Sequence, residues 1–539
     1  MSKLRTMRFF AIVALALLAA CAAEPPPQPL KLTILHNNDF HSRMLMVNAF
    51  GSTCSTQEAQ QNRCMGGAAR VATLVATNRA EATAAGRQVL VLNAGDFFQG
   101  SLFYTHYKGA AELEFANMLG LDAMAIGNHE FDDGPANFSR FLRGAKFPVV
   151  SANTNAAAEP EIRGQFRDAV VLERGGVRIG IIGATTEDTP EISSPGQNVK
   201  FPRAETVIAP VVARLRSEGV NHIIVVSHLG LFRDREVAAA VDGIDVIVGG
   251  HSHTLLANGL RGAEGPYPVR IKGPAGREVP IVQAGSFSRW IGRLDVDFDA
   301  AGNVIAANGN SIEVAQSVRP DPAVQAMVDR LDAPLAQVRT QVVGAAAIDY
   351  PLDGCRAREC ALGNLVAEAM LVATRAAGTT IAVQNGGGLR AGIASGQVTL
   401  GAVLTTLPFQ NNVATLKLKG SDLVAALENG LSQVAENGGR FPQLAGARLT
   451  WELARPAGQR VVSLEVKKPD GSFAPIQPDA VYTVATNDFM RRGGDGYAVF
   501  RDRAIDPYDF GPGLDDALAN YIRSSSPVRV STDGRIVNR

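Results

Sequence analysis

Short apolar runs that stop abruptly at polar residues recur from Leu30 to about Asp299, and this pattern constrains the fold more than any other feature of the chain. Continuous β-branched and aliphatic runs of this length predict strands that are buried on both faces. The Ala-rich amphipathic stretches between them, such as Ala110–Leu119 and Val207–Ser217, predict helices. We therefore expect a layered α/β domain whose strands lie between helices.

The carboxyl ends of these strands carry residue types that bind metals. Ligands of α/β sheets bind beyond those ends, and five of the eight histidines follow a predicted strand. One His or Asp at a strand end is more often a turn or capping residue than a ligand. Five strand ends that each supply an oxygen or imidazole donor are hard to explain in that way. The candidate ligands are Asp39, His41, Asp96, Asn128, His228, His251 and His253.

The chemistry of this donor set indicates which ions it suits. Mixed carboxylate, amide and imidazole donors favour Zn, Mn, Co or Fe, and the absence of a thiolate argues against a structural zinc site. Seven ligands are too many for one ion. They fit two ions that share one carboxylate, with water in the open positions.

Five strings in order, NNDFHSR, GDFFQGS, GNHEFDDG, SHLG and GGHSHT, resemble the metallophosphoesterase domain of the 5′-nucleotidase family. The resemblance implies a four-layer α/β/β/α domain over residues 30–313 and two divalent ions, Zn, Mn, Co or Mg. By position, one ion would be held by Asp39, His41, Asp96 and His253. The other would be held by Asp96, Asn128, His228 and His251, with Asp96 as the bridge. His253 stands where the best-known members have Asn or Gln.

Two ions lower the pKa of a bound water and clamp a phosphate, so the protein needs one further group on the leaving side. His129 follows the ligand Asn128 but belongs to neither ion. Asp132, three residues on at the predicted start of a helix, could orient His129 and stabilise its cationic form, and the pair matches the family pattern. Asp132 could also cap that helix.

A second domain is expected over residues 341–539, after a linker and connecting helix at 314–340. Prolines precede a helical pattern of Val324, Met327, Val328 and Leu331 in this linker. The turns NGGGLR at 385–390, LPFQNN at 407–412 and NDFMRRGGDGY at 487–497 are weak signals singly. Together they resemble the smaller α/β nucleotide-binding C-terminal domain of the same family.

This resemblance also implies which side chains hold a nucleotide. Arg356 in CRAREC would bind substrate, Asn385 and Arg390 would add polar contacts, and Asp495 would bind the ribose hydroxyls. Phe409 and Phe489 would sandwich the base, since aromatic faces stack on any base.

Several neighbouring residues could alter the choice of substrate. Gln410 stands where relatives commonly have Gly, and it could narrow the pocket. Arg491 and Arg492 could contact a longer phosphate chain, and the role of Arg358 stays open.

The first 20 residues have the layout of a secretory signal, because basic residues precede an apolar run that is too short to span a bilayer. Leu18-Ala19-Ala20-Cys21 resembles the bacterial lipobox, in which the chain is cleaved just before the cysteine and the cysteine thiol is acylated. We expect a Pro-rich tether at 21–29 and a lipoprotein of the outer membrane that faces the periplasm or the cell surface. The alternative is ordinary cleavage that discards or merely exposes Cys21.

Export would place the other cysteines in an oxidising compartment, where close pairs are more often disulfides than metal sites. The pairs are Cys54 with Cys64 and Cys355 with Cys360, and neither has C-x-x-C spacing. The alternative is free thiols.

Lys plus Arg equals Asp plus Glu at 52 each, so no global field attracts a nucleic-acid polymer. We expect a lipid-anchored two-metal 5′-nucleotidase that acts on nucleoside monophosphates, with ADP and ATP as further candidates, for extracytoplasmic salvage. The same scaffold fits a UDP-sugar pyrophosphatase or a 2′,3′-cyclic nucleotide 2′-phosphodiesterase with 3′-nucleotidase activity. A catalytically silent nucleotide-binding lipoprotein is a third hypothesis, against which the complete ligand set argues. The oligomeric state is not indicated.

Overall fold

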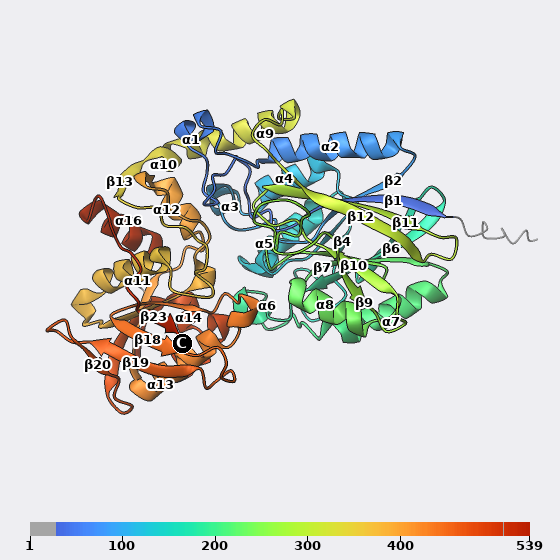
Figure 1. The fold of residues 1–539 in the computed structure, drawn as a ribbon. Helices are drawn as coiled ribbons and strands as arrows, with labels where there is room; N and C mark the ends of the chain where they lie inside the picture. The colour runs from blue at the N-terminus through green and yellow to red at the C-terminus, as the bar shows by residue number, and fades with distance from the viewer. Residues whose placement is uncertain (1–28, 510) are drawn as a thin grey trace, which may run out of the picture.

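The computed structural model describes residues 29–509 and 511–539, which fold into two α/β domains lying side by side (Figure 1). The predicted two-domain α/β architecture is confirmed. The predicted signal peptide at 1–20 and all but the last residue of the tether at 21–29 lie outside the described residues. Within the described part of the chain, no helix is long and apolar enough to cross a membrane.

The N-terminal domain is built on two six-stranded mixed sheets. The first sheet has the order β12 (Val304–Glu313), β11 (Trp290–Phe298), β1 (Leu30–Asn37), β2 (Gln88–Asn93), β3 (Ala123–Ala125) and β4 (Val149–Val150). The second has the order β5 (Ala169–Arg174), β6 (Val177–Thr185), β7 (His222–His228), β8 (Val246–Gly249), β10 (Glu278–Val282) and β9 (Val269–Lys272). The sheets pack face to face, since Ile34 and Leu92 of the first share one buried cluster with Ile181 and Val226 of the second.

Helices cover the outer face of each sheet, which gives the α/β/β/α layering. The first sheet is covered by α2 (Ala68–Ala84), α4 (Ala110–Leu119) and α5 (Gly134–Gly144). The second is covered by α7 (Ala204–Ser217) and α8 (Leu231–Ala240). Short helices in the loops are α1 (Thr56–Gln60), α3 (Leu102–Tyr107) and α6 (Thr189–Ile192).

The parallel strands bring the predicted ligand-bearing ends together. β1, β2 and β3 run parallel in the first sheet, and β6, β7, β8 and β10 run parallel in the second. Asn93 at the end of β2 donates a hydrogen bond to the side chain of Asn37 at the end of β1 (3.2 Å). The polar residues that follow these strands therefore meet at one edge of the domain.

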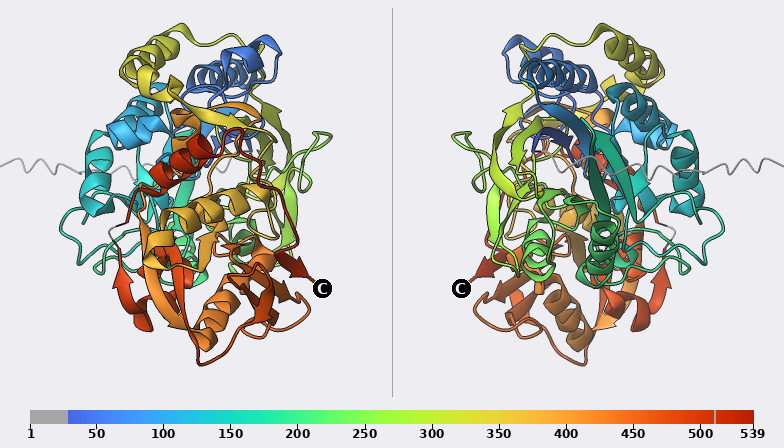
Figure 2. Two further views of the ribbon diagram at one scale, coloured as in Figure 1. Left: turned by 90° about the vertical axis from the view of Figure 1, so that its left-hand side faces the viewer. Right: turned by 90° about the vertical axis from the view of Figure 1, so that its right-hand side faces the viewer.

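A helical connection links the two domains. Asp321 caps α9 (Pro322–Asp332) by accepting from the N–H groups of Ala323 and Val324. The four apolar positions predicted to line one face of this helix are all buried, and α9 packs on α2. Views from either side show the two helices together at the top of the molecule (Figure 2). The connection then continues through α10 (Ala336–Thr340).

The C-terminal domain contains three sheets. A two-stranded sheet pairs β13 (Val342–Ala346) with β15 (Gly396–Thr399). The central sheet has the order β17 (Pro442–Ala445), β14 (Ile381–Asn385), β21 (Val481–Asn487), β16 (Val413–Lys419) and β22 (Ile505–Tyr508). The third has the order β20 (Phe473–Pro475), β19 (Val461–Lys467), β18 (Ala447–Trp451) and β23 (Ile536–Asn538).

Buried clusters lie on both faces of the central sheet, because Ile381 and Val383 of β14 face one cluster and Ala382 faces the other. The helices of this domain are α11 (Ala361–Ala373), α12 (Leu400–Thr406), α13 (Gly420–Leu431), α14 (Asp488–Arg491), α15 (Ala498–Asp502) and α16 (Leu514–Ser524). α11 and α16 pack together on one face, and α13 lies on the other.

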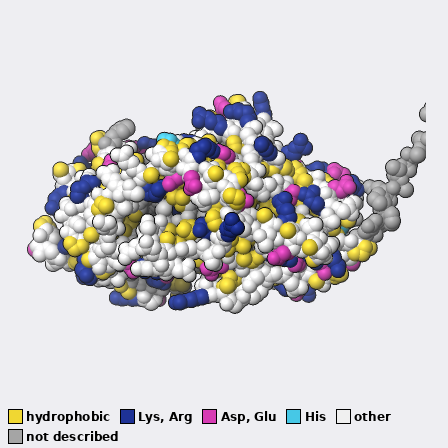
Figure 3. Space-filling model, turned by 90° about the horizontal axis from the view of Figure 1, so that it is seen from above, with side chains coloured by type: hydrophobic (Ala, Val, Ile, Leu, Met, Phe, Trp, Pro, Cys, Tyr) yellow, Lys and Arg dark blue, Asp and Glu magenta, His cyan; other side chains and the backbone are white. Residues whose placement is uncertain are grey.

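Both predicted cysteine pairs form disulfides, Cys54 with Cys64 and Cys355 with Cys360. The face of the molecule in Figure 3 carries basic and acidic side chains intermixed.

Candidate active site

The seven predicted ligands come together at the carboxyl edge of the two sheets. Asp39 and His41 follow β1, Asp96 follows β2, Asn128 follows β3, His228 ends β7, and His251 and His253 follow β8. Donor atoms of six of these residues, together with His129, form three groups, each within 4.8 Å: Asp39, His41 and His253; His41, Asp96 and His129; Asp96, His228 and His251. His41 and Asp96 each belong to two groups, and Asp96 is the carboxylate among the shared residues, as a bridging ligand has to be.

Close approaches between donor atoms mark two points inside the cluster. At the first, the Nε2 atom of His253 lies 3.2 Å from Asp39 Oδ1 and 3.0 Å from His41 Nε2. At the second, His228 Nε2 lies 3.0 Å from Asp96 Oδ2. Imidazole nitrogens and carboxylate oxygens that converge in this way suit a divalent cation.

Backbone carbonyls set the protonation of two of these imidazoles. His41 Nδ1 lies 3.2 Å from the carbonyl of Phe98, and His228 Nδ1 lies 2.6 Å from that of Ala94. Because a carbonyl only accepts, each Nδ1 carries a proton and each Nε2 is the ring nitrogen that faces the cluster. Asn128 Oδ1 is buried with no hydrogen-bond partner among the described residues, which is the state of an amide oxygen reserved for a ligand. The residues present therefore fit divalent ions.

The pKa shifts of the cluster also fit a bound cation. Burial lowers the pKa of His251 to about 3 and that of His253 to about 4, so both imidazoles are neutral near pH 7. Burial would also lower the pKa of His228, but the carboxylate of Asp96 raises it to about 10. The pKa of Asp96 lies well below its usual value, because the neighbouring histidines outweigh its burial. The cluster thus combines the ionised carboxylate of Asp96 with the neutral imidazoles of His251 and His253, which is a donor set that suits a cation.

The backbone at most of these ligands is left-handed, which is costly for residues other than glycine. The φ angles are 48° at Asp39, 49° at His41, 57° at Asp96, 73° at His251 and 57° at His253. Close packing adds to the constraint, since a Cβ atom at Gly127 would lie 2.2 Å from Asp96 Oδ1. Strain of this kind gathers at functional sites.

Glu130 is a functional residue that the sequence reasoning missed. Its buried carboxylate accepts from the backbone N–H groups of Asp96 (3.0 Å), Phe97 (2.9 Å) and Gly127 (2.7 Å). It therefore ties the loop after β2 to the loop after β3. Burial and the charge of Asp96 raise the pKa of Glu130 to about 7. The string GNHEFDDG contains Glu130, but the sequence does not show which backbone groups it meets.

His129 and Asp132 form the predicted pair. His129 Nδ1 lies 2.6 Å from Asp132 Oδ2, and the backbone N–H of His129 donates to Asp96 Oδ1 (3.0 Å). Burial would lower the pKa of His129, but the carboxylates of Asp132 and Asp96 raise it. Asp132 is not the N-cap of α5, which begins at Gly134 after Asp133, but it ends the single helical turn His129–Phe131. Its carboxylate accepts instead from Gln99 Nε2 (3.2 Å) and Ser193 Oγ (2.7 Å).

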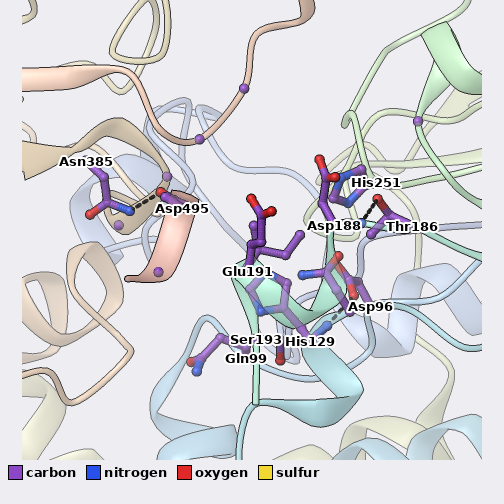
Figure 4. A pocket seen from close by; sticks show the side chains of 18 of the residues that line it. Asp96, Gln99, His129, Thr186, Asp188, Glu191, Ser193, His251, Asn385 and Asp495 are labelled. Carbon is purple, nitrogen blue, oxygen red and sulfur yellow. Dashed lines mark hydrogen bonds between the residues drawn. The ribbon is translucent and has the colours of Figure 1, made fainter. Parts of the chain in front are cut away.

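A cleft of about 1060 Å³ separates the two domains, and side chains of both line it. Figure 4 shows Asp96, His129 and His251 of the N-terminal domain on one side and Asn385 and Asp495 of the C-terminal domain on the other. All six predicted substrate-binding residues line this cleft: Arg356, Asn385, Arg390, Phe409, Phe489 and Asp495.

Asn385 and Asp495 form a buried polar unit. Asn385 Nδ2 donates to Asp495 Oδ2 (2.6 Å), and Asn487 Nδ2 donates to Asn385 Oδ1 (2.9 Å). Asn429 Nδ2 holds the backbone carbonyl of Asp495 (3.0 Å), where the φ angle is 55°. The unit therefore presents the Asp495 carboxylate in a fixed position.

Arg390 of the C-terminal domain reaches the metal-ligand cluster. Its Nη2 atom lies 2.9 Å from His41 Nε2, and its guanidinium lies 5.9 Å from the ring centre of Phe409. Burial and the charge of Arg356 lower the pKa of Arg390 to about 10. The Phe409 ring stacks on His129 with ring centres 5.7 Å apart. Arg356 and Arg390 thus both lie in the cleft, and Arg390 contacts the cluster directly.

Backbone geometry constrains the positions of Phe489 and Gln410. The Phe489 ring lies against Gly494, where a Cβ atom would come within 2.4 Å of it. The φ angle of Gln410 is 57°, which explains why a glycine suits this position, and its side chain meets Lys108 Nζ at 3.2 Å.

The three additional arginines differ in their surroundings. Arg491 is held by both carboxylate oxygens of Asp509, whereas Arg492 is largely exposed and lines the cleft. Arg358 is exposed and pairs with Asp353.

The three histidines without a predicted role take part in packing. His36 Nε2 lies 2.8 Å from the hydroxyl of Tyr267, and His222 packs edge-on against Phe298. His106 packs against Tyr107.

An α/β/β/α domain with Asp, His and Asn side chains gathered at its carboxyl edge is the framework of a metal-dependent phosphoesterase. Residues 32–255 match the calcineurin-like phosphoesterase family, and residues 339–502 match the 5′-nucleotidase C-terminal domain. The chain is a phosphoric ester hydrolase whose fold implies divalent metal ions. With both domains present in this order, the chain belongs to the 5′-nucleotidase family.

Relatives cover nearly the whole chain. The 5′-nucleotidase of Homo sapiens is 36% identical over 529 residues, which are 94% of this chain and 90% of the human protein. The crystal structure of a 5′-nucleotidase precursor from Thermus thermophilus is 40% identical, with a TM-score of 0.89 over 94% of this chain and 99% of that one. The Haemophilus influenzae NAD nucleotidase is 25% identical, with a TM-score of 0.57 over 95% and 99%.

Proposed function

We propose that this protein is a two-metal 5′-nucleotidase that releases phosphate from nucleoside 5′-monophosphates outside the cytoplasm. The observation that carries the proposal is the interdomain cleft, which joins the metal-ligand cluster and the His129–Asp132 pair to the Asn385–Asp495 unit. A nucleotide that spans this cleft places its ester phosphate at the cluster and its nucleoside in the C-terminal domain.

The ligand sets are assigned by position. Asp39, His41, Asp96 and His253 would hold one ion, and Asp96, Asn128, His228 and His251 would hold the other. Bound divalent ions supply an activated water and polarise the phosphoryl oxygens. The carbonyls that orient His41 and His228 and the tie made by Glu130 keep these donors in place.

Substrate binding falls to the C-terminal domain. Arg356 and Arg390 both line the cleft and carry planar cationic groups that match a phosphate. Burial lowers the pKa of Arg356, and the charges of Asp495 and Asp39 oppose this shift. Asp495, fixed by Asn385, accepts from the ribose hydroxyls. Phe409 and Phe489 stack on the base.

His129 acts on the leaving group. Its Nδ1 is engaged by Asp132, so Nε2 is the atom that holds the proton taken up by O5′ as the bond from O5′ to phosphorus breaks. Asp132 stabilises the imidazolium and fixes its ring. Nucleoside and inorganic phosphate are the products.

Phosphate release from a panel of esters tests the proposal. The panel contains AMP, ADP, ATP, UDP-glucose, NAD, 2′,3′-cyclic AMP and p-nitrophenyl phosphate, assayed before and after chelation and with Zn, Mn, Co or Mg restored. AMP should be the preferred substrate, and only metal should restore activity after chelation. Preference for UDP-glucose, NAD or the cyclic nucleotide would favour the pyrophosphatase or phosphodiesterase alternatives. Activity that survives chelation would refute the metal-dependent reaction.

We further propose that the protein is a bacterial lipoprotein anchored through Cys21 to the outer membrane. The lipobox-like segment and the apolar run before it support this proposal. Cys21→Ser should abolish incorporation of labelled palmitate and release the protein into the aqueous phase of a detergent partition. Equal partitioning of the variant and the wild type would contradict the anchor.

A further inference from the structure

Ser193 makes a contact that the proposed function does not use. Its hydroxyl donates to Asp132 Oδ1 (2.7 Å), while Asp132 Oδ2 engages His129 (2.6 Å). Ser193 and His129 thus bond to different oxygens of this carboxylate. In Figure 4, Ser193 lies beside His129 and Glu191 lies between the two halves of the cleft.

Ser193 is the last residue of a short segment, residues 188–193, which contains α6. Ser193 directly follows α6, and its backbone N–H donates to the carbonyl of Thr189 (3.0 Å). Thr189 is fully buried and its hydroxyl bonds to the carbonyl of Thr186 (2.7 Å), which follows β6. One side of the 188–193 segment is therefore anchored in the N-terminal domain.

The other side of the 188–193 segment contacts the C-terminal domain. Glu191 Oε2 pairs with Arg440 Nη2 (3.0 Å), and Gln433 Nε2 lies 3.4 Å from Asp188 Oδ2. Arg440 Nη1 lies 3.3 Å from Asn429 Oδ1, and Asn429 in turn holds the backbone of Asp495. Polar contacts on its two sides therefore connect the 188–193 segment to His129, through Asp132, and to Asp495, through Arg440 and Asn429.

We propose that Ser193 is a positioning residue for the Asp132–His129 pair, and that the Glu191–Arg440 ion pair holds the 188–193 segment in this place when the two domains are closed. The inference rests on the proposed function, because it assumes that His129 acts on a leaving group. Ser193 fixes the plane of the Asp132 carboxylate, so that Oδ2 faces His129 Nδ1. Opening of the domains breaks the contacts of Glu191 and Asp188, so that only the contacts with the N-terminal domain still hold the segment.

The test compares two esters that differ in their need for a proton. Loss of the Ser193 hydroxyl in Ser193→Ala should lower kcat for AMP about tenfold with KM within about twofold, as expected for a residue that orients a reacting group. Turnover of p-nitrophenyl phosphate, whose leaving group needs no proton, should change less than about twofold. Ser193→Thr, which keeps the hydroxyl, should restore turnover of AMP.

Ser194→Ala is the matched control, since no side-chain hydrogen bond of Ser194 is found among the described residues. It should resemble the wild type with both esters. Equal losses with both esters in Ser193→Ala, or no loss with AMP, would overturn the positioning role. A wild-type protein that leaves AMP intact would instead overturn the proposed function and this inference with it.

A double-mutant cycle tests the link to domain closure. If Glu191 holds Ser193 in place, Ser193→Ala should cost less in the Glu191→Ala background than in the wild type. The loss of kcat for AMP in the double variant should then be smaller than the product of the two single losses. Independent, fully multiplicative effects would overturn the link.

Discussion

At the scale of single residues, the arrangement around His129 separates a proton-handling group from the metal ligands. His129→Ala is expected to lower kcat for AMP by about 10²–10⁴-fold, because the departing O5′ loses its proton donor. Both metals should stay bound, since the His129 side chain engages Asp132, and the backbone N–H that donates to Asp96 remains in the variant. Metal content and phosphate release measured on the same preparation check both statements.

The exposed His106 on α3 provides a control of the same residue type, and His106→Ala should behave as the wild type. Loss of metal from His129→Ala would contradict the prediction. His129 would then belong with the ligands, which its proximity to His41 and Asp96 allows.

The positions of the seven candidate ligands could be predicted from sequence because each lies at the end of a strand with a clear apolar pattern or within a few residues after it. The parallel pairing of those strands then brings the side chains together. Gln99, Glu130 and Ser193 could not be predicted in this way. Their partners are backbone amides or carboxylates on loops that meet only in the folded chain.

At the scale of single elements, the start of α11 combines a disulfide with a helix cap. Cys360 precedes the helix, and its sulfur accepts from the N–H of Gly363 (3.1 Å). Replacing Cys355 and Cys360 together by Ser should lower the free energy of unfolding by about 2 kcal/mol. It should also raise KM for AMP more than it lowers kcat, because Arg356 lies in the closed loop. Thermal unfolding and steady-state kinetics measure the two effects.

The second disulfide provides the comparison. Replacing Cys54 and Cys64 by Ser should destabilise the protein while leaving KM unchanged, since this pair closes a loop of the N-terminal domain. A similar rise in KM in both double variants would contradict a specific role for the loop that holds Arg356.

The connection between β7 and β8 gives the protein a pH-dependent stability. Asp245 accepts from the N–H of Ile223 (2.7 Å), and burial raises its pKa from 3.8 to about 7. The folded protein therefore keeps a proton that the unfolded chain releases above about pH 4. Its free energy of unfolding should fall as pH rises from about 4 to about 7.

Asp245→Asn, which is neutral at every pH, should remove this contribution. The variant should nearly match the wild type near pH 4, where Asp245 is protonated in the folded chain and about half protonated in the unfolded chain, and exceed its stability at pH 8 by on the order of 2 kcal/mol. Thermal unfolding at the two pH values measures the difference. Asp242→Asn, at an exposed neighbouring position, should show no such difference. A gain that is equal at both pH values would contradict the argument.

At the scale of the whole molecule, the site exists only where the two domains meet. Arg390 and His41 are 349 positions apart in sequence and 2.9 Å apart in the structure. The N-terminal domain also accepts from the backbone of the C-terminal domain, through Gly392 N–H to the carbonyl of Phe50 (2.8 Å). The sequence motifs predict which domain holds which group. The motifs do not predict the contacts between the domains, because these contacts depend on how two domains with separate cores pack against each other.

Catalysis should require these domains to separate in each cycle, because substrate enters and product leaves a cleft lined by both. Asp188→Cys combined with Gln433→Cys, joined by a short bifunctional crosslinker, should lower kcat more than about tenfold. The same double variant without crosslinker, and each single variant treated with it, are the controls. An unchanged kcat in the crosslinked protein would show that closure and opening are not needed for turnover.

The left-handed backbone at Asp39, His41, Asp96, His251 and His253 has a consequence for how such a protein can change. Each of these positions is held against its conformational preference by the surrounding fold, so glycine there would relieve strain while deleting a donor. A library selected only for heat resistance should therefore accumulate replacements at these positions early. Selection for phosphate release is what keeps them, and thermal robustness and activity are opposed at the same five residues.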